Sequence, residues 1–240
     1  MTAPTNDFIV MTSGAFTAAY LSLMPQLERL TKKTIVTATT SVGTGEKSIP
    51  NRLKRGDVAD IVIVADTLLR KFIEDGLVLA ESRQPLACSS IGIAVRAGAP
   101  KPDISSIDAL RRTLLQAKSI AYSASVSGEY LTTELCQRLG IADEVLGKSR
   151  HIGGGERTGA VVARGEAEIA FQQMSELLPV PGIAYITPLP PEVQKVSVFS
   201  AGVAATSPDV DLARSVIQFL ASAEAAAAIA KSGLELIGNR

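Results

Sequence analysis

Short apolar runs alternate with amphipathic segments along most of the chain. The runs at 8–11 and 60–65 are short and continuous, as in strands that are buried on both faces of a sheet. Between them, apolar residues recur three or four positions apart, as at Phe16, Tyr20 and Leu23, which is typical of helices that cover a sheet. The pattern therefore predicts an α/β fold with mainly parallel strands.

The same pattern continues to the end of the chain. Strands or strand-like apolar segments are predicted at 8–11, 35–39, 60–65, 86–88, 91–95, 119–122, 167–171, 196–199 and 202–205. Helices are predicted at 16–30, 46–54 with a possible break at Pro50, 67–74, 106–114, 131–139, 158–163 and 209–231, with a further helix starting within 172–176.

Charge and composition narrow the function classes. The 240 residues include 24 Lys and Arg against 24 Asp and Glu, so the formal net charge is zero. Nucleic-acid binders usually carry a basic surface, because counterion release drives their affinity, and no such excess is present. With 46% hydrophobic and 20% charged residues, the chain is globular, and its length suits one large domain or two small ones.

The chain has few residues that could bind a metal or form disulfides, and it lacks the common nucleotide-binding motifs. Cys88 and Cys136 are too few for a disulfide framework, and a single histidine, His151, excludes a site with several histidine ligands. Neither a phosphate-binding loop ending in Gly-Lys-Ser/Thr nor the dinucleotide-binding glycine pattern occurs. We therefore expect no metal and no cofactor.

The first residues lack the features of an export signal. Residues 1–7 are polar, without a basic region followed by an apolar one, and no apolar run has the length of a membrane helix. The sequence predicts a cytoplasmic protein if Met1 is native and a periplasmic one if Met1 replaces a removed signal peptide. We favour the second.

Four loops place hydroxyl groups or glycine between a strand end and a helix start. They lie at 13–14, 41–44, 125–128 and 153–158. Backbone N–H groups at helix starts attract anions, and glycine lets a ligand approach closely. Each loop alone is explained by helix capping and turn formation. Their number favours a shared anion site at the carboxyl ends of the strands.

Several segments, in order, resemble a known family. They are 11–16, the loop 41–44, 52–63 and 162–170. Together they resemble the molybdate-binding-protein-like members of the type II solute-binding proteins. The resemblance implies a two-lobed type II periplasmic-binding-protein fold with a small anion in a crevice between the lobes. Lobe one would comprise 1–86 and 197–240, and lobe two 87–196.

The resemblance also implies ligand contacts. The family's ligand loops, carried onto the matching positions, indicate Ser13, Gly14, Ser41, Gly43, Thr44, Ser125, Ser127 and Gly128. Molybdate binders commonly place a Tyr just after the strand that follows the 162–170 block, where this chain has Gln172 and Gln173. The segment 171–179 is similar to a branch of the family that binds organic acids and includes aconitate isomerase. That branch implies a polycarboxylate ligand.

Three further residues have the chemistry of a carboxylate site. Arg157 can bind a carboxylate through two parallel hydrogen bonds, although a surface Arg at a helix start is the simpler explanation. Thr158 lies in the same loop, and Gln172 can bind a carboxylate without adding charge.

Four residues are candidates to carry a proton. Lys47 follows the second loop, Glu129 follows the third, Glu156 lies in the fourth, and His151 has the one side-chain type whose unperturbed pKa lies near neutrality. Each also has an ordinary explanation, as a solvated lysine, a helix-start carboxylate or a packed histidine.

The resemblance, together with these residues, implies two alternative functions. One is an isomerase that interconverts cis- and trans-aconitate by allylic proton transfer. The other is a non-catalytic solute-binding component of an ABC transporter for a small anion, which would need a permease as partner. In either case we expect a monomer that binds a small polycarboxylate or oxyanion and no nucleic acid.

Overall fold

The computed structural model describes residues 7–153 and 155–237, and the chain divides into two compact units. One unit is formed by the chain up to Cys88 together with the chain from Val198 onward, and the other is Ser89–Ser197. The chain passes from one unit to the other within β4 (Gln84–Arg96) and again within β9 (Val196–Val203). That these units act as two lobes closing on a ligand stays a prediction.

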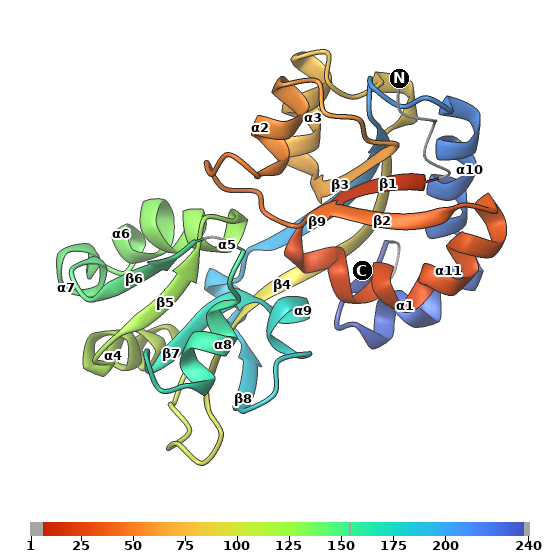
Figure 1. The fold of residues 1–240 in the computed structure, drawn as a ribbon. Helices are drawn as coiled ribbons and strands as arrows, with labels where there is room; N and C mark the ends of the chain where they lie inside the picture. Colours follow the sequence, from red (N-terminus) through yellow and green to blue (C-terminus); the bar gives the residue numbers. More distant parts are fainter. Residues whose placement is uncertain (1–6, 154, 238–240) are drawn as a thin grey trace. The chain divides into compact units, whose positions relative to one another are not determined.

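The first unit is a sheet with helices on its faces (Figure 1). Its other elements are β1 (Asp7–Thr12), α1 (Gly14–Thr31), β2 (Thr34–Thr39), α2 (Ile49–Lys54), β3 (Ile61–Ala65), α3 (Asp66–Glu74), η1 (Ala80–Ser82), α10 (Val210–Leu220), α11 (Ala223–Lys231) and β10 (Glu235–Leu236). β1 pairs in parallel with β2 and β3, and β9 pairs antiparallel with β3. Alternate strand residues face opposite sides. Val62 and Val64 pack with Leu53 of α2 and Phe72 of α3.

The second unit repeats this plan with its own strands. Its elements are α4 (Ile107–Gln116), β5 (Ile120–Ser123), α5 (Val126–Tyr130), η2 (Leu131–Leu135), α6 (Cys136–Arg138), α7 (Ala142–Leu146), β6 (Ser149–Ile152), α8 (Thr158–Ala163), β7 (Ile169–Gln173), α9 (Met174–Leu177), β8 (Ile183–Pro188) and η3 (Pro191–Val193). β5 pairs in parallel with β6 and β7, whereas β7 and β8 pair antiparallel with β4.

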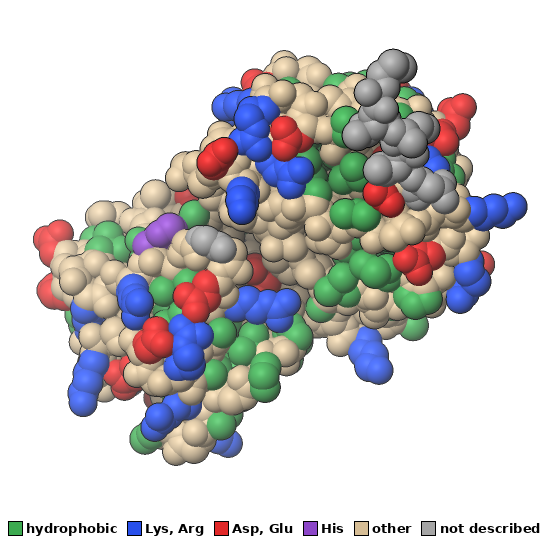
Figure 2. All heavy atoms as spheres, viewed as in Figure 1, with side chains coloured by type: hydrophobic (Ala, Val, Ile, Leu, Met, Phe, Trp, Pro, Cys, Tyr) green, Lys and Arg blue, Asp and Glu red, His purple; other side chains and the backbone are tan. Residues whose placement is uncertain are grey.

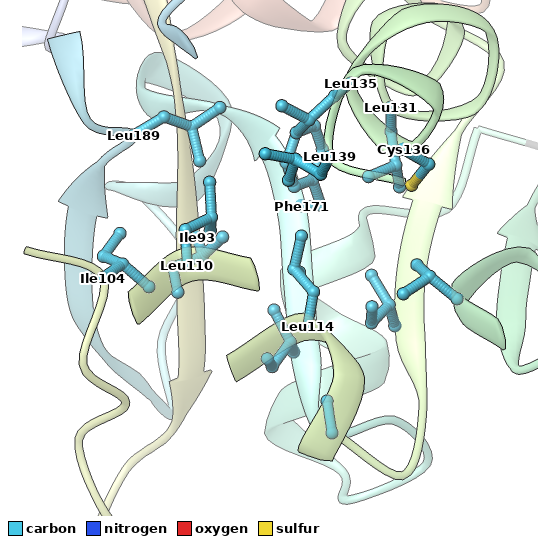
Figure 3. Close-up of a cluster of buried hydrophobic side chains, with 14 of the residues drawn as sticks. Ile93, Ile104, Leu110, Leu114, Leu131, Leu135, Cys136, Leu139, Phe171 and Leu189 are labelled. Carbon is cyan, nitrogen blue, oxygen red and sulfur yellow. The ribbon is translucent and has the colours of Figure 1, made fainter. Parts of the chain in front are cut away.

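Two cores lie on opposite faces of the second sheet. Ile93 and Phe171 belong to a large core with α4 and the segment from η2 to α7, while their neighbours Ala94 and Ala170 belong to a smaller core with α8 and α9. Figure 3 shows the large core, with Phe171 beside Leu135 and Leu139 and with Leu110, Leu114, Leu131, Cys136 and Leu189 around them. The small residues on the second face let α8 and α9 approach the strands closely.

The structure corrects several details of the predicted elements. The helix predicted at 209–231 is two helices, α10 and α11, bent by 63° at Ala221 and Ser222. The apolar segments 86–88 and 91–95 form one strand, β4, because Cys88 pairs with β10 and Ile91 with β7. β7 continues to Gln173 instead of ending at 171, since Gln172 and Gln173 both pair with β4.

The helices within residues 7–153 and 155–237 differ in length and hydropathy from a membrane span. No single helix there is both long and apolar enough to cross a bilayer, and α10 with α11 reaches that length only as a bent pair.

Candidate functional site

The second unit carries polar side chains where β5 and β7 end. The two strands pair in parallel, with Ala121 opposite Ala170, and both alanines face α8 and α9. Because side chains alternate along a strand, Ser123 and Gln172 face the same side two residues further on. Strand pairing therefore brings Gln172, a predicted site residue, together with Ser123 at one edge of the sheet.

Gln172 is the centre of this polar group. Its Nε2 donates to Ser123 Oγ at 3.4 Å and to Glu176 Oε2 at 2.7 Å, and its Oε1 accepts a hydrogen bond from Thr158 Oγ1. Gln172 is 2% exposed, and Thr158 is buried. Three partners fix the amide's orientation, so that an N–H group points at Glu176.

Serine hydroxyls extend the group along the loop before α5. Ser123 Oγ lies 3.0 Å from Ser125 Oγ, which lies 3.0 Å from Ser127 Oγ. Gly128 allows this close arrangement, because a Cβ there would lie 1.8 Å from the carbonyl oxygen of Ser123. Close packing therefore accounts for the glycine at position 128. The three serine hydroxyls form a row of neutral hydrogen-bond donors, the type of group that binds carboxylates.

Glu176 adds a titratable carboxyl group to this site. The residue as a whole is partly exposed, but its carboxyl group lies deep enough that burial raises its pKa to about 7, against the opposing positive charge of Arg157. Arg157 is itself exposed, at the residue that precedes α8. A carboxyl group that titrates near neutrality can both take up and release a proton.

The first unit has its own polar loop, after β1. Ser13 precedes α1, is 5% exposed, and its Oγ has no hydrogen-bond partner among the described residues. Its backbone N–H is already bonded to Ile63 O at 2.7 Å, and Gly14 begins the helix. Buried hydroxyls nearly always have partners, so the unpartnered Ser13 Oγ is unusual for a side chain this deep. Ser48 Oγ, before α2, likewise has no hydrogen-bond partner among the described residues.

The second predicted loop of this unit is more open. Ser41 and Gly43 are half-buried and Thr44 is exposed. The side chain of Asn51 donates to the carbonyl oxygen of Thr44 at 2.9 Å, which ties the loop to α2. Lys47 is exposed.

The three remaining predicted proton carriers lie on the surface of the second unit. Glu129 is exposed, and Glu156 is 2.6 Å from Arg164 in an ion pair. His151, the one histidine and the purple side chain in Figure 2, is exposed and meets the ring of Tyr122 edge to face at 5.5 Å. None of these three is buried, in contrast to the carboxyl group of Glu176.

The structure therefore places four of the predicted residues in one hydrogen-bonded group and adds a residue that was not predicted. Ser125, Ser127, Thr158 and Gln172 belong to one hydrogen-bonded group, and Glu176 is the titratable member that the sequence analysis overlooked. Gly154 of the predicted fourth loop and Met1 lie outside the described residues. Within residues 7–153 and 155–237, no three His, Cys, Asp or Glu residues gather as metal ligands.

Comparison with known proteins gives consistent results. Residues 8–235 match the model of a family described as bacterial extracellular solute-binding proteins. The aconitate isomerase of a Pseudomonas species is 42% identical over 233 residues, which cover 97% of this chain and 88% of that protein.

Solved structures agree on the fold. The periplasmic molybdate-binding protein of Azotobacter vinelandii superposes with a TM-score of 0.76 at 18% identity, covering 95% of this chain and 99% of that one. The tungstate ABC transporter structure from Geobacter sulfurreducens gives 0.69 at 18% identity, covering 94% and 98%. At these identities the likeness concerns the fold, which confirms the predicted two-lobed type II periplasmic-binding-protein class.

Proposed function

Because the chain belongs to the bacterial extracellular solute-binding protein family, we propose that it binds a small polycarboxylate and interconverts cis- and trans-aconitate. The observation that carries this proposal is the 42% identity to an aconitate isomerase along almost the whole chain. The site of the second unit supports it, since neutral hydroxyl and amide donors stand near the cation Arg157, as a substrate with several carboxylates requires.

The reaction is an allylic proton transfer. A base removes a proton from the methylene carbon, and the electrons of that C–H bond form a new double bond to the central carbon. The electrons of the old double bond then take up a proton at the opposite carbon. Negative charge that develops on the substrate is stabilised by hydrogen bonds to its carboxylates.

The chain's own residues divide this work. In the second unit, carboxylates of the substrate are bound by Ser125, Ser127, Thr158 and Arg157. Ser13, Gly14, Ser41, Gly43 and Thr44 are proposed as the ligand-binding residues of the first. Lys47, Glu129, Glu156 and His151 are the proton carriers suggested by the sequence, and all four are exposed.

A second function has its own support. Structures of the same fold include proteins named for molybdate and for tungstate. The competing proposal is therefore a non-catalytic binding component of an ABC transporter. It would be a periplasmic monomer that delivers its ligand to a permease. The family description as extracellular fits a periplasmic location for either function.

One experiment separates the two. The purified protein is incubated with trans-aconitate, and cis-aconitate is followed by chromatography against a sample without protein. Protein-dependent formation of cis-aconitate supports the isomerase. Thermal stabilisation by trans-aconitate or molybdate without turnover supports the binder.

A matched variant tests the carboxylate contact. Arg157→Ala is expected to weaken the binding of aconitate by about 1.5–3 kcal/mol, the range for a hydrogen bond to a charged group. Arg112→Ala, an exposed Arg in α4, serves as the control. Tight molybdate binding that is unaffected by the loss of Arg157 would argue against an organic acid ligand.

A further inference from the structure

Glu176 is the titratable group at the end of the hydrogen-bonded row in the second unit. Its Oε2 accepts a hydrogen bond from Gln172, while its Oε1 accepts none within the described part of the chain. Gln172 is itself held by Thr158 and Ser123, so the carboxyl group has a fixed position with one oxygen left for a ligand. Burial makes this position unfavourable for a charged carboxylate.

We propose that Glu176 is the catalytic residue that carries the proton between the two carbons of the substrate. This inference rests on the isomerase function proposed above and adds a residue to it. The carboxylate of Glu176 takes a proton from the substrate's methylene carbon, and the electrons of the broken C–H bond form the new double bond. Glu176 then returns the proton to the carbon at the far end of the old double bond. One proton leaves and one is returned, so the step needs no co-reactant.

The groups around Glu176 favour this assignment. α9 packs against α8, β7 and β8. Arg157, the residue before α8, contributes a positive charge, and β7 contributes the neutral amide of Gln172. The tyrosine of β8, Tyr185, packs against the large core on the other face of the sheet, beneath Lys101. Arg157 is thus the charge that keeps Glu176 available as a base at neutral pH.

Gln172 acts as a positioning residue in this scheme. Its amide donates to Oε2 of Glu176, which leaves Oε1 for the substrate in this scheme, and its own orientation is set by Thr158. A charged or shorter side chain at position 172 would release Glu176 from this contact.

The test compares two glutamates of the same unit. Glu176→Gln keeps the size of the side chain and an acceptor oxygen but cannot take up a proton. Glu144→Gln makes the same change on the exposed side of α7 and is the control. For each protein, kcat is measured from pH 5 to 9 by the chromatographic assay. The Kd for trans-aconitate is measured by calorimetry, and the fold by circular dichroism.

The expected result is a loss of turnover without a loss of binding. Glu176→Gln lowers kcat by about 10²-fold or more, the usual contribution of a general acid or base, and leaves the Kd within a few-fold of the wild type. The wild type and Glu144→Gln show a kcat that rises with pH and levels off above about 7, because the base must be deprotonated.

The outcomes separate the two proposals. An active wild type with equal turnover in Glu176→Gln overturns the role of Glu176 and leaves the isomerase intact. A wild type that binds trans-aconitate but never forms cis-aconitate overturns the isomerase itself. If Glu176→Gln does not fold, the wild-type profile decides, since a kcat that is flat between pH 5 and 9 contradicts a carboxyl base of this acidity.

Discussion

Removing the charge of Glu176 is expected to stabilise the protein in alkaline solution. Glu176→Gln retains the shape of the side chain and an oxygen that can accept the hydrogen bond from Gln172. It removes only the ability to ionise in a buried place. Because an uncharged amide suffers less from burial than a carboxylate, the variant should unfold at higher denaturant concentration than the wild type at about pH 8.

The magnitude follows from the two pKa values. The pKa of Glu176 rises from 4.5, the value of an exposed glutamate, to about 7 in the folded protein. Between these values the folded protein holds a proton that the unfolded chain releases, so the free energy of unfolding falls as the pH rises. Each pKa unit corresponds to about 1.4 kcal/mol, so the full loss is about 3 kcal/mol above pH 7 and vanishes below about pH 4.5.

Urea unfolding followed by circular dichroism measures this effect. The wild type, Glu176→Gln and the control Glu144→Gln are compared at about pH 4.5 and about pH 8. The advantage of Glu176→Gln should grow by about 3 kcal/mol between the two, while the control tracks the wild type. Unfolding curves for wild type and Glu176→Gln that shift in parallel with pH would refute the buried, proton-binding carboxyl group, whatever the activity of the variant.

Three other substitutions test the remaining sites. Ser13→Ala should leave the ligand-free protein as stable or up to about 1 kcal/mol more stable in urea, because it removes an unpartnered buried hydroxyl, and should weaken ligand binding in calorimetry. Gly128→Ala should destabilise by about 1–3 kcal/mol in the same assay, since its Cβ would overlap Ser123 O. Arg83→Met breaks two hydrogen bonds to Asp66, at 2.7 and 2.8 Å, and should cost about 1.5–3 kcal/mol at neutral pH. Because Arg83 holds the pKa of Asp66 below its usual range, this cost should disappear as acid protonates Asp66.

The fold could be predicted because its signal is local. Continuous apolar runs of strand length and amphipathic segments of helix length follow one another, and this order alone indicates an α/β fold. The break between α10 and α11 gave no such signal. The 63° bend lies at Ala221 and Ser222, where Ser222 is the N-cap residue of α11, and a single serine within a long apolar helical pattern is too weak a sign to predict a break.

Part of the candidate site could also be predicted, because its signal is local in the sequence. Ser125, Ser127 and Thr158 lie where small polar residues follow a strand, a pattern that can be read along the sequence. Sequence alone could not decide which of Gln172 and Gln173 faces the hydroxyl groups, and the pairing of β5 with β7 assigns that position to Gln172. Glu176 was missed because burial, a tertiary property, is what distinguishes it from any glutamate in a first helical turn.

The position of Glu176 bears on the choice between the two functions. A protein that only binds an anion gains nothing from a carboxyl group beside its ligand, because two negative charges repel each other and the buried group also destabilises the fold. An isomerase needs a group that can hold a proton and release it near neutral pH, and burial opposed by Arg157 produces that property. Natural chains keep such unfavourable residues mainly where activity requires them. Glu176, held by Gln172 beside a row of neutral donors, therefore fits the proposed proton transfer better than it fits transport alone.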